Sequence, residues 1–572
     1  MKLRENLFYL VIAAFYLCFV LFKDSFVYKS YFFFACFILF VCVFLIYFSF
    51  VFRVDSGKIK INLPIILAFL LITIPFIIYL ITNKIGLEFV FYYVCVFVLF
   101  IIFSFMQNSI NILKINKLII AFAFCETVIC FLQFCGIIKS STDVFEVTGI
   151  SFNPNITAMF IALSLPVIIS FFNKSNKKST KIFLCLLIGF ELIALILLKS
   201  RTAFLGVCVI VFLLLLKNYY KNRKIIAIIS VCVVLISILA IPKLYNLKKD
   251  SADGRFFIWK VATEMINKNP SGYGYGTTQS DYNKAQSVYF QQHTTTKQEQ
   301  NTAEFTFNLM NDYLETAVMG GIAGGILYLA FIISILYFGL KHWNTNFYAF
   351  IGVFVFAVMS LVNFAFFVPQ IALLFTYYSA ISTKNAKALF TININKNLFF
   401  IFGSVFLFIA CGFIFTRYNI NSAYNLLDNK NPAEAKVKLK RLNLFTPTNE
   451  IYYRCFGDCY FAEKDFENAL KYYSKAINYS YYPKTLIKMA NCEFYLKNFG
   501  EALDNLQFTS NIQPVLFEPH YCEMMIYLNI KDLEKAHQKA NFILQKEIKF
   551  ENKKIDFYRE QANKILKIKE LQ

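Results

Sequence analysis

The stretch that decides how this chain is organised begins with KSR at residues 199–201, crosses two apolar segments and opens into a polar insert. The insert reads DGRFFIW at 253–259 and NPSGYGYG at 269–276, and it closes with NLMNDYL at 308–314. The sequence on both sides is mostly apolar and aromatic. Because hydrocarbon cannot satisfy irregular polar backbone, we predict that the insert lies outside a membrane.

The composition is that of a polytopic membrane protein. Of 572 residues, 58% are hydrophobic and 19% are aromatic, and the mean hydropathy is +0.54, whereas a soluble domain is about half apolar. The formal charge of +22 comes from short loops between apolar segments and from the tail. Membrane topology explains this charge, so nucleic-acid binding is not expected. Most of the 15 cysteines lie in apolar segments, where Cys acts as a small hydrophobe.

Apolar segments of about 17–25 residues are long enough to cross a bilayer. We predict thirteen spans, with twelve as the alternative because 347–382 is also interpretable as one kinked re-entrant unit. The predicted spans are 7–22, 31–52, 63–82, 87–106, 118–138, 156–172, 182–198, 203–216, 225–243, 315–340, 347–362, 366–382 and 398–416. The first follows Lys2 and Arg4 and has no small-residue cleavage site after it, which favours a retained span.

The distribution of Lys and Arg orients these spans. With the N-terminus inside, cytoplasmic loops such as 174–181 and 217–224 are rich in Lys and Arg, and the short external loops are poor in them. This orientation places the insert and the tail on the external face. We therefore predict a transmembrane domain at 1–416, with an external loop at 244–314, and a soluble domain at 420–572.

The tail is charged and helical, and it carries an internal repeat. Ala435, Ala469, Ala502 and Ala536 recur at spacings of 34, 33 and 34, and aromatic residues surround Gly457. A small residue is needed where the two helices of a hairpin cross closely. The pattern resembles tetratricopeptide (TPR) repeats and predicts an α-solenoid of three to four helix pairs.

The insert is predicted to begin with a surface helix. Asp253 is expected to cap a helix from Gly254 to about Lys268, whose apolar stripe through Phe257 would lie on the membrane. Arg255 in the first turn would oppose the helix dipole, which predicts an anionic partner. The Gly-rich segment that follows lacks the strand–turn–helix context of a dinucleotide loop and is interpreted as a tight turn.

Two arginines are candidates for binding a charged ligand. Arg201 lies with Lys199 at the external end of an apolar segment, and Arg255 lies in the insert. Guanidinium groups bind diphosphates through bidentate hydrogen bonds, and we predict that Arg201, Arg255 and Lys199 bind one together. The alternatives are that Arg201 reaches lipid phosphates and that Arg255 is a solvated surface residue.

Six short motifs, in this order, resemble the O-antigen ligase and polymerase superfamily over roughly residues 1–416. They are Thr148-Gly149; Asn153-Pro154-Asn155; Ser200-Arg201 with Gly206; Gly254-Arg255 with Trp259; Pro270 with Gly272 and Gly274; and Asn311-Asp312-Tyr313-Leu314 with Gly321 and Gly324.

The resemblance implies a lipid-linked glycan transferase with the membrane-embedded, GT-C-like glycosyltransferase fold. Members take a glycan from undecaprenyl diphosphate at the external leaflet of the bacterial inner membrane and pass it to lipid A core, a protein hydroxyl or another glycan. They use no metal and no cofactor. The family's donor-binding arginines correspond to Arg201 and Arg255, and the insert and tail would be periplasmic.

One position departs from the family pattern. Ligases of the family carry His, as the base that activates the acceptor, immediately before the Asn-x-Tyr-Leu segment, and here that residue is Met310. We predict that Asp312 or Glu304 serves as the catalytic base. The alternatives are Glu315, His293, or a leaving group that departs without a base.

The sequence thus predicts an O-antigen ligase or a protein O-glycosyltransferase whose TPR-like tail binds a peptide or protein. A polymerase is the alternative within the same enzyme class. Outside that class, the alternative is a non-catalytic envelope scaffold or a transporter, for which Glu126 and Glu191 within apolar segments are the evidence.

Overall fold

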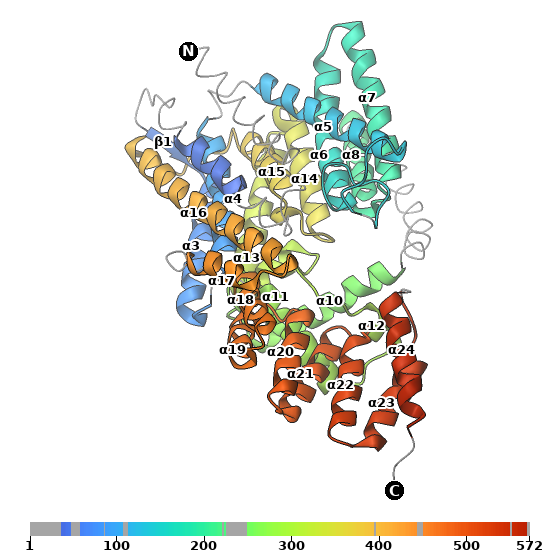
Figure 1. The fold of residues 1–572 in the computed structure, drawn as a ribbon. Coiled ribbons are helices and arrows are strands. Elements are labelled where there is room, and N and C mark those ends of the chain that lie inside the picture. Colours follow the sequence, from blue (N-terminus) through green and yellow to red (C-terminus); the bar gives the residue numbers. More distant parts are fainter. Residues whose placement is uncertain are drawn as a thin grey trace. The chain divides into compact units, whose positions relative to one another are not determined.

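A computed structural model describes residues 36–46, 58–84, 86–106, 112–142, 144–219, 222, 224, 249–393, 396–442, 450–549 and 552–568. The chain divides into two compact units (Figure 1). Unit 1 comprises residues 1–83, 87–247 and 310–415, and unit 2 comprises residues 84–86, 248–309 and 416–572. Most of the insert therefore belongs to the same unit as the tail.

Unit 1 is built from apolar helices, and the protein is a multi-pass membrane protein. In the described part of the chain, nine helices are long and apolar enough to cross a membrane. They are α3 (Leu63–Thr82), α4 (Leu87–Met106), α5 (Ile112–Phe134), α6 (Pro154–Lys174), α7 (Lys178–Leu197), α8 (Arg201–Tyr219), α13 (Asp312–Lys341), α14 (Trp343–Ser360) and α16 (Lys396–Asp428). The last of these continues into unit 2.

Each of these helices corresponds to a predicted span, and one further predicted span, 366–382, is a shorter helix separated from α14 by a break at residues 361–368. Residues 366–382 form the end of a 3-10 turn, η1 (Ala365–Phe367), followed by α15 (Pro369–Ser382), which has only 14 residues and is mostly buried in unit 1. Pro369 suits the first position of a helix and marks this start. The predicted spans 7–22 and 225–243 lie outside the described residues, and of 31–52 only the helix Cys36–Ile46 is described.

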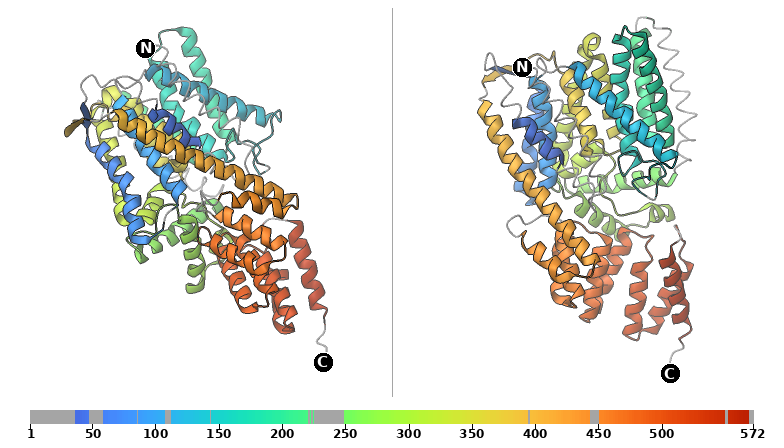
Figure 2. Two further views of the ribbon diagram at one scale, coloured as in Figure 1. Left: turned by 60° about the vertical axis from the view of Figure 1, so that its left-hand side comes forward. Right: turned by 45° about the horizontal axis from the view of Figure 1, so that its top comes forward.

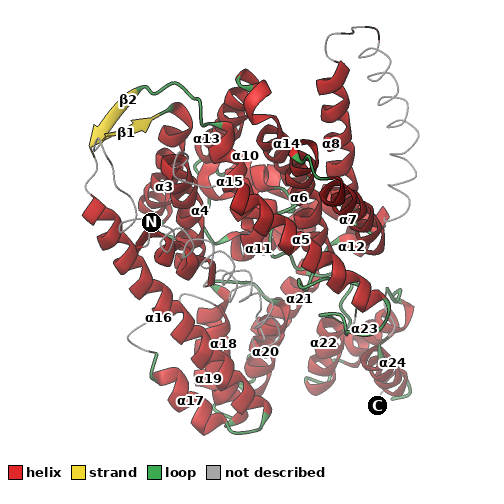
Figure 3. Ribbon diagram, turned by 90° about the horizontal axis from the view of Figure 1, so that it is seen from above, coloured by secondary structure: helices red, strands yellow, loops and turns green. Residues whose placement is uncertain are grey.

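The prediction of an all-α fold is confirmed, with one small addition. In the described residues the only strands are β1 (Lys58–Ile61) and β2 (Phe390–Asn393), which pair antiparallel with Ile59 opposite Ile392 (Figure 3).

The insert folds into three helices within unit 2, namely α10 (Lys249–Lys268), α11 (Thr278–Gln292) and α12 (Lys297–Thr302). On α10, Phe257 and Val261 are 4% and 1% exposed. The Phe257 ring lies 5.5 Å from Phe290 and 5.6 Å from Tyr289 of α11. The apolar stripe predicted to lie on the membrane is therefore buried in the insert's own core.

The tail is a TPR-like helical solenoid, as the repeat predicts (Figure 2). Its helices are α17 (Pro432–Lys440), α18 (Glu450–Ala462), α19 (Phe466–Ile477), α20 (Pro483–Tyr495), α21 (Phe499–Ile512), α22 (Glu518–Asn529), α23 (Leu533–Gln545) and α24 (Lys553–Leu566). The four repeating alanines lie on α17, α19, α21 and α23, and each is fully buried. A larger side chain at these positions would push the two helices of a pair apart.

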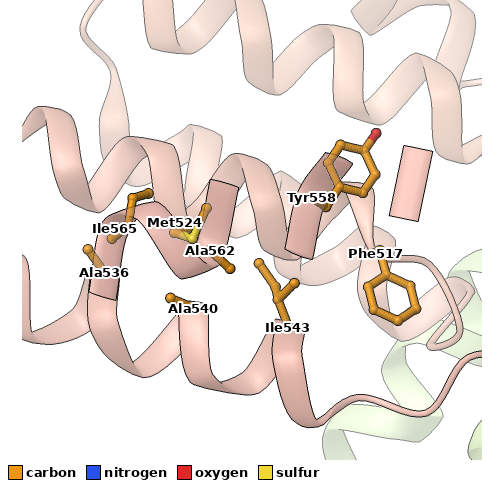
Figure 4. Packing of buried hydrophobic residues seen from close by; sticks show 8 residues of the cluster. All are labelled: Phe517, Met524, Ala536, Ala540, Ile543, Tyr558, Ala562 and Ile565. Carbon is orange, nitrogen blue, oxygen red and sulfur yellow. The ribbon is translucent and has the colours of Figure 1, made fainter. Parts of the chain in front are cut away.

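The last three solenoid helices close around one apolar core (Figure 4). Ala536 and Ala540 of α23 face Met524 of α22 and Ala562 of α24, and all four are fully buried. Small residues on α23 let its neighbours approach closely, so the repeat spacing seen in the sequence is a packing requirement.

Candidate functional site

Arg201 is the first residue of α8 and is half-buried. Ser200 precedes it, is fully buried, and accepts a hydrogen bond from the Ala203 amide at 3.4 Å, which caps the helix. Lys199 adopts a left-handed backbone conformation with φ +51°, and its Nζ lies 4.0 Å from the Glu146 carboxylate. The loop after α5 therefore borders the turn that carries Arg201.

Two polar side chains of α5 hold this loop, a role that no local pattern in the sequence indicates. Gln133 accepts hydrogen bonds from the Thr148 and Gly149 amides at 2.9 and 2.8 Å and donates to the Gly149 carbonyl at 2.9 Å. Glu126 accepts from the Ile150 amide at 3.1 Å. Glu126, which suggested transport, thus has a structural role in the loop.

The backbone of Gly149 explains why glycine stands in this motif. Its φ is +68°, and a Cβ there would lie 2.6 Å from the Thr157 side chain and 2.9 Å from a Glu126 carboxylate oxygen. Any larger residue would have to displace both side chains. The Thr148-Gly149 motif is therefore explained by local packing.

The helix that carries Arg255 begins earlier than predicted. Because α10 starts at Lys249, Asp253 does not cap it but lies inside it, where its carboxylate accepts a hydrogen bond from Gln298 of α12. Arg255 lies in the second turn and is half-buried. The predicted penalty from the helix dipole, which falls off beyond the first turn, does not apply.

Lys260 and Glu299 form a second link between α10 and α12, at 2.8 Å. The hydrogen bond that Lys260 donates to the Glu299 carboxylate raises the pKa of Lys260. Partial burial raises the pKa of Glu299, but the hydrogen bonds from Lys260 and Thr296 and the positive charge of Lys260 together outweigh burial and lower the pKa of that carboxyl. The stabilisation from this ion pair is therefore fully present at pH values above the ordinary carboxyl pKa. It is lost as the pH falls through the lowered pKa of Glu299.

Trp259 connects Arg255 to the segment that ends the insert. Its indole Nε1 donates to the Leu309 carbonyl at 3.0 Å. Trp259 lies one helical turn after Arg255, and Leu309 is adjacent in the chain to Met310, where ligases of the family carry His. In the motif Gly254-Arg255-x-x-x-Trp259, the four-residue spacing thus puts Arg255 on the same face of α10 as Trp259.

The Gly-rich segment packs against the turn between α3 and α4. The Gly86 amide donates to the Tyr275 carbonyl at 2.8 Å. Gly274 has φ +114°, and a Cβ there would lie 2.9 Å from the Lys84 carbonyl. Lys84 also forms an ion pair with Asp281 of α11 at 2.6 Å. The tight turn therefore ties the insert to residues 84–86.

The Asn311-Asp312-Tyr313 motif anchors the start of α13 within unit 1. Asn311 caps the helix and donates to the Leu361 carbonyl at 2.9 Å, and the Tyr313 hydroxyl donates to the Ala357 carbonyl at 3.1 Å. Asp312 is 1% exposed, and its carboxylate accepts from the Phe366 amide at 2.8 Å. All three side chains hold the segment from the end of α14 to η1.

The other candidate bases also have partners. Glu304 is half-exposed and lies 2.8 Å from Lys549 of the solenoid, and Glu315 is buried. His293 lies 3.7 Å from the Glu264 carboxylate. Glu264 is nine residues after Arg255, which at 100° per residue places it on the opposite side of α10, so His293 and Arg255 lie on different faces of that helix.

Comparisons with known proteins identify part of the chain. A search of curated proteins finds no match. The model of the O-antigen ligase family matches residues 182–329. This segment is similar to O-antigen ligases. It contains Arg201, Arg255 and the Asn311 motif, so the resemblance seen in the sequence is confirmed over residues 182–329, and the match supports a membrane glycan-transfer function.

One solved structure, the crystal structure of the APC/C hetero-tetramer Cut9-Hcn1, matches at 10% identity over 82% of this chain and 76% of that chain, with a TM-score of 0.22. A score this low supports no conclusion. Within the described residues, no three His, Cys, Asp or Glu side chains are grouped closely enough to hold a metal ion. In the matched segment, Arg201 belongs to unit 1 and Arg255 to unit 2, and their joint binding of one diphosphate stays a prediction.

Proposed function

We propose that this protein transfers a glycan from undecaprenyl diphosphate to an acceptor at the outer leaflet of a bacterial inner membrane, with the insert and the solenoid in the periplasm. The match of the O-antigen ligase family over residues 182–329 carries this proposal, because that segment includes both candidate arginines. The proposed acceptors are lipid A core and a protein hydroxyl. A polymerase, whose acceptor is another glycan, is distinguished by its product.

The chemistry requires positive charge at the leaving group. The acceptor oxygen attacks the anomeric carbon, and the bond from that carbon to the diphosphate oxygen breaks and leaves its electron pair on the diphosphate. Fixed guanidiniums bind more strongly as this charge develops, which lowers the barrier. In this proposal Arg201 and Arg255 bind the diphosphate, Lys199 adds a third positive charge, and neither a metal nor a cofactor takes part.

In this mechanism neither Asp312 nor Glu304 acts as the catalytic base. Asp312 is buried and bonded to the Phe366 amide, and Glu304 is paired with Lys549. Both contacts support structural roles. The acceptor proton then passes to a departing diphosphate oxygen or to water, and the good leaving group compensates for Met310 in place of His.

The test is transfer of a lipid-linked glycan by purified full-length variants. Arg201→Ala and Arg255→Ala should each lower the rate by roughly 10²–10³-fold, whereas Arg441→Ala, at an exposed position after α17, should not. Normal transfer by both site variants, with a wild-type fold, refutes the proposal.

Isosteric variants test the carboxylates separately. Asp312→Asn retains an oxygen that can accept from Phe366, and Glu304→Gln retains the shape of the side chain. Both should stay within a few-fold of wild type. A loss of about 10²-fold or more in either variant would identify that residue as the base.

A further inference from the structure

The insert runs along one edge of the solenoid, within unit 2. It contacts the solenoid at an equivalent position in three successive repeats, at or just after the ends of α19, α21 and α23. The Phe305 ring lies 5.2 Å from Tyr482, which follows α19, and the Gln286 amide donates to the Ile512 carbonyl at the end of α21. Lys549, which follows α23, donates to the Asn301 carbonyl at 3.0 Å.

The helix at the centre of this contact is polar and nevertheless buried. Asn283, Gln286 and Ser287 of α11 are each 0% exposed. Ser287 donates to the Phe508 carbonyl of α21 at 3.3 Å. The Asn283 side chain donates to the Thr306 carbonyl at 2.9 Å and accepts from the Thr306 amide at 3.0 Å. Burial of polar side chains is costly unless they are hydrogen-bonded, so the solenoid supplies acceptors that α11 needs in order to pack as it does.

An apolar contact adds to these bonds. Phe305 packs against the solenoid cluster that contains Tyr473, Leu486 and Ile512. From α11 the contact continues to α10, because Tyr289 and Phe290 pack on Phe257, two residues after Arg255. The solenoid thus supports α11, and α11 supports the helix that carries Arg255.

We propose that the solenoid is a positioning element of the transferase itself, which holds the insert so that Arg255 is in place for the donor diphosphate. This inference rests on the function proposed above for Arg255. The interaction surface is the edge formed by the turns after α19, α21 and α23, and its partner is the insert of the same chain. Loosening this surface lowers the fraction of molecules that are competent to bind the donor, and the apparent affinity falls by that fraction.

The decisive variant is Phe305→Ala in the full-length protein, with Phe307→Ala as the matched control. Phe307 lies two residues away in the same segment and is 63% exposed; its ring meets that of Phe305 edge-on at 5.0 Å, so its truncation uncovers one side of Phe305 and leaves the contact of Phe305 with the solenoid cluster in place. Lys549→Ala is a second variant, on the solenoid side, that removes a surface contact without opening a core. Hydrogen exchange of residues 278–292 and transfer kinetics with two chemically different acceptors are measured for each.

Phe305→Ala should speed exchange of α11 and lower kcat/KM for the lipid-linked donor by about tenfold with both acceptors. Lys549→Ala should do the same to a smaller degree, and Phe307→Ala should resemble wild type. Unchanged α11 exchange in both test variants overturns the inference, as does faster exchange with unchanged donor kinetics or with loss of one acceptor only. If Arg255→Ala leaves transfer intact, the proposed function fails, and the exchange data still decide whether the solenoid holds the insert.

Discussion

Replacement of Gln133 by Met tests whether the end of α5 holds the loop beside Lys199. Met has a similar length and forms no comparable hydrogen bonds, so the variant removes three contacts, to the Thr148 amide and to both polar groups of Gly149. Gln133 is 5% exposed and Thr148 is 0% exposed, so water does not replace these bonds while the loop stays closed.

A buried polar group left without a partner costs about 1–3 kcal/mol. The Gly149 carbonyl still accepts from the Thr148 hydroxyl at 3.3 Å, so two amides lose their partner, and at about 1.5 kcal/mol each Gln133→Met destabilises the closed loop by about 3 kcal/mol. Since each 1.4 kcal/mol is a factor of ten, the open fraction should rise by about 100-fold. Helix α5 itself should persist, because the change lies in its last turn.

Hydrogen exchange of peptides from residues 140–153, in the protein reconstituted in a bilayer, measures this opening. Gln133→Met should exchange about 100-fold faster at Thr148 and Gly149, whereas Gln292→Met, at an exposed glutamine, should leave these rates unchanged. Rates within threefold of wild type would refute the reasoning, because the loop would then be held by other contacts.

Three other changes probe the insert and the solenoid. Trp259→Phe removes the bond to the Leu309 carbonyl and should cost about 1 kcal/mol, seen as a severalfold loss of donor transfer; wild-type transfer would show that this bond does not position the segment. Gly274→Ala combines φ +114° with a Cβ 2.9 Å from the Lys84 carbonyl, so it should release the insert from residues 84–86 and expose 272–276 to protease; wild-type resistance would contradict this. Burial lowers the pKa of Lys546 to about 8, so the unfolded state binds more protons above that pH, and the contribution of this lysine to stability rises from pH 8 to about 10. In thermal unfolding, the difference between Lys546→Met and wild type should therefore change between pH 7.5 and 9.5, and a constant difference would argue against the lowered pKa.

The sequence predicted the features that repeat or that depend on length. Apolar runs located the helices of unit 1 to within a few residues, because crossing a bilayer demands a minimum length of apolar chain. The recurrence of Ala435, Ala469, Ala502 and Ala536 every 33 or 34 residues predicted the solenoid, because every repeat must solve the same packing problem. The length of α15 was overestimated, because a helix that is buried against protein is as apolar as one that contacts lipid.

The candidate residues were found, but their partners were not. The sequence identified Trp259, Gly274 and Asp312 as parts of motifs, and the structure adds what each one contacts. Gln133 was missed because a glutamine near the end of an apolar helix carries no local signal; its role appears only where the chain returns 16 residues later.

By itself, the sequence determined that this is a membrane protein with a polar insert and a repeated helical tail, because periodicity and hydropathy are local properties of the chain. Only the tertiary structure decided that the insert folds onto the tail, through contacts such as Gln286 with Ile512, which are 226 residues apart. The physical reason is that a buried hydrogen bond forms between a donor and an acceptor that lie close together in the folded protein. Their positions in the sequence do not show that they will be close.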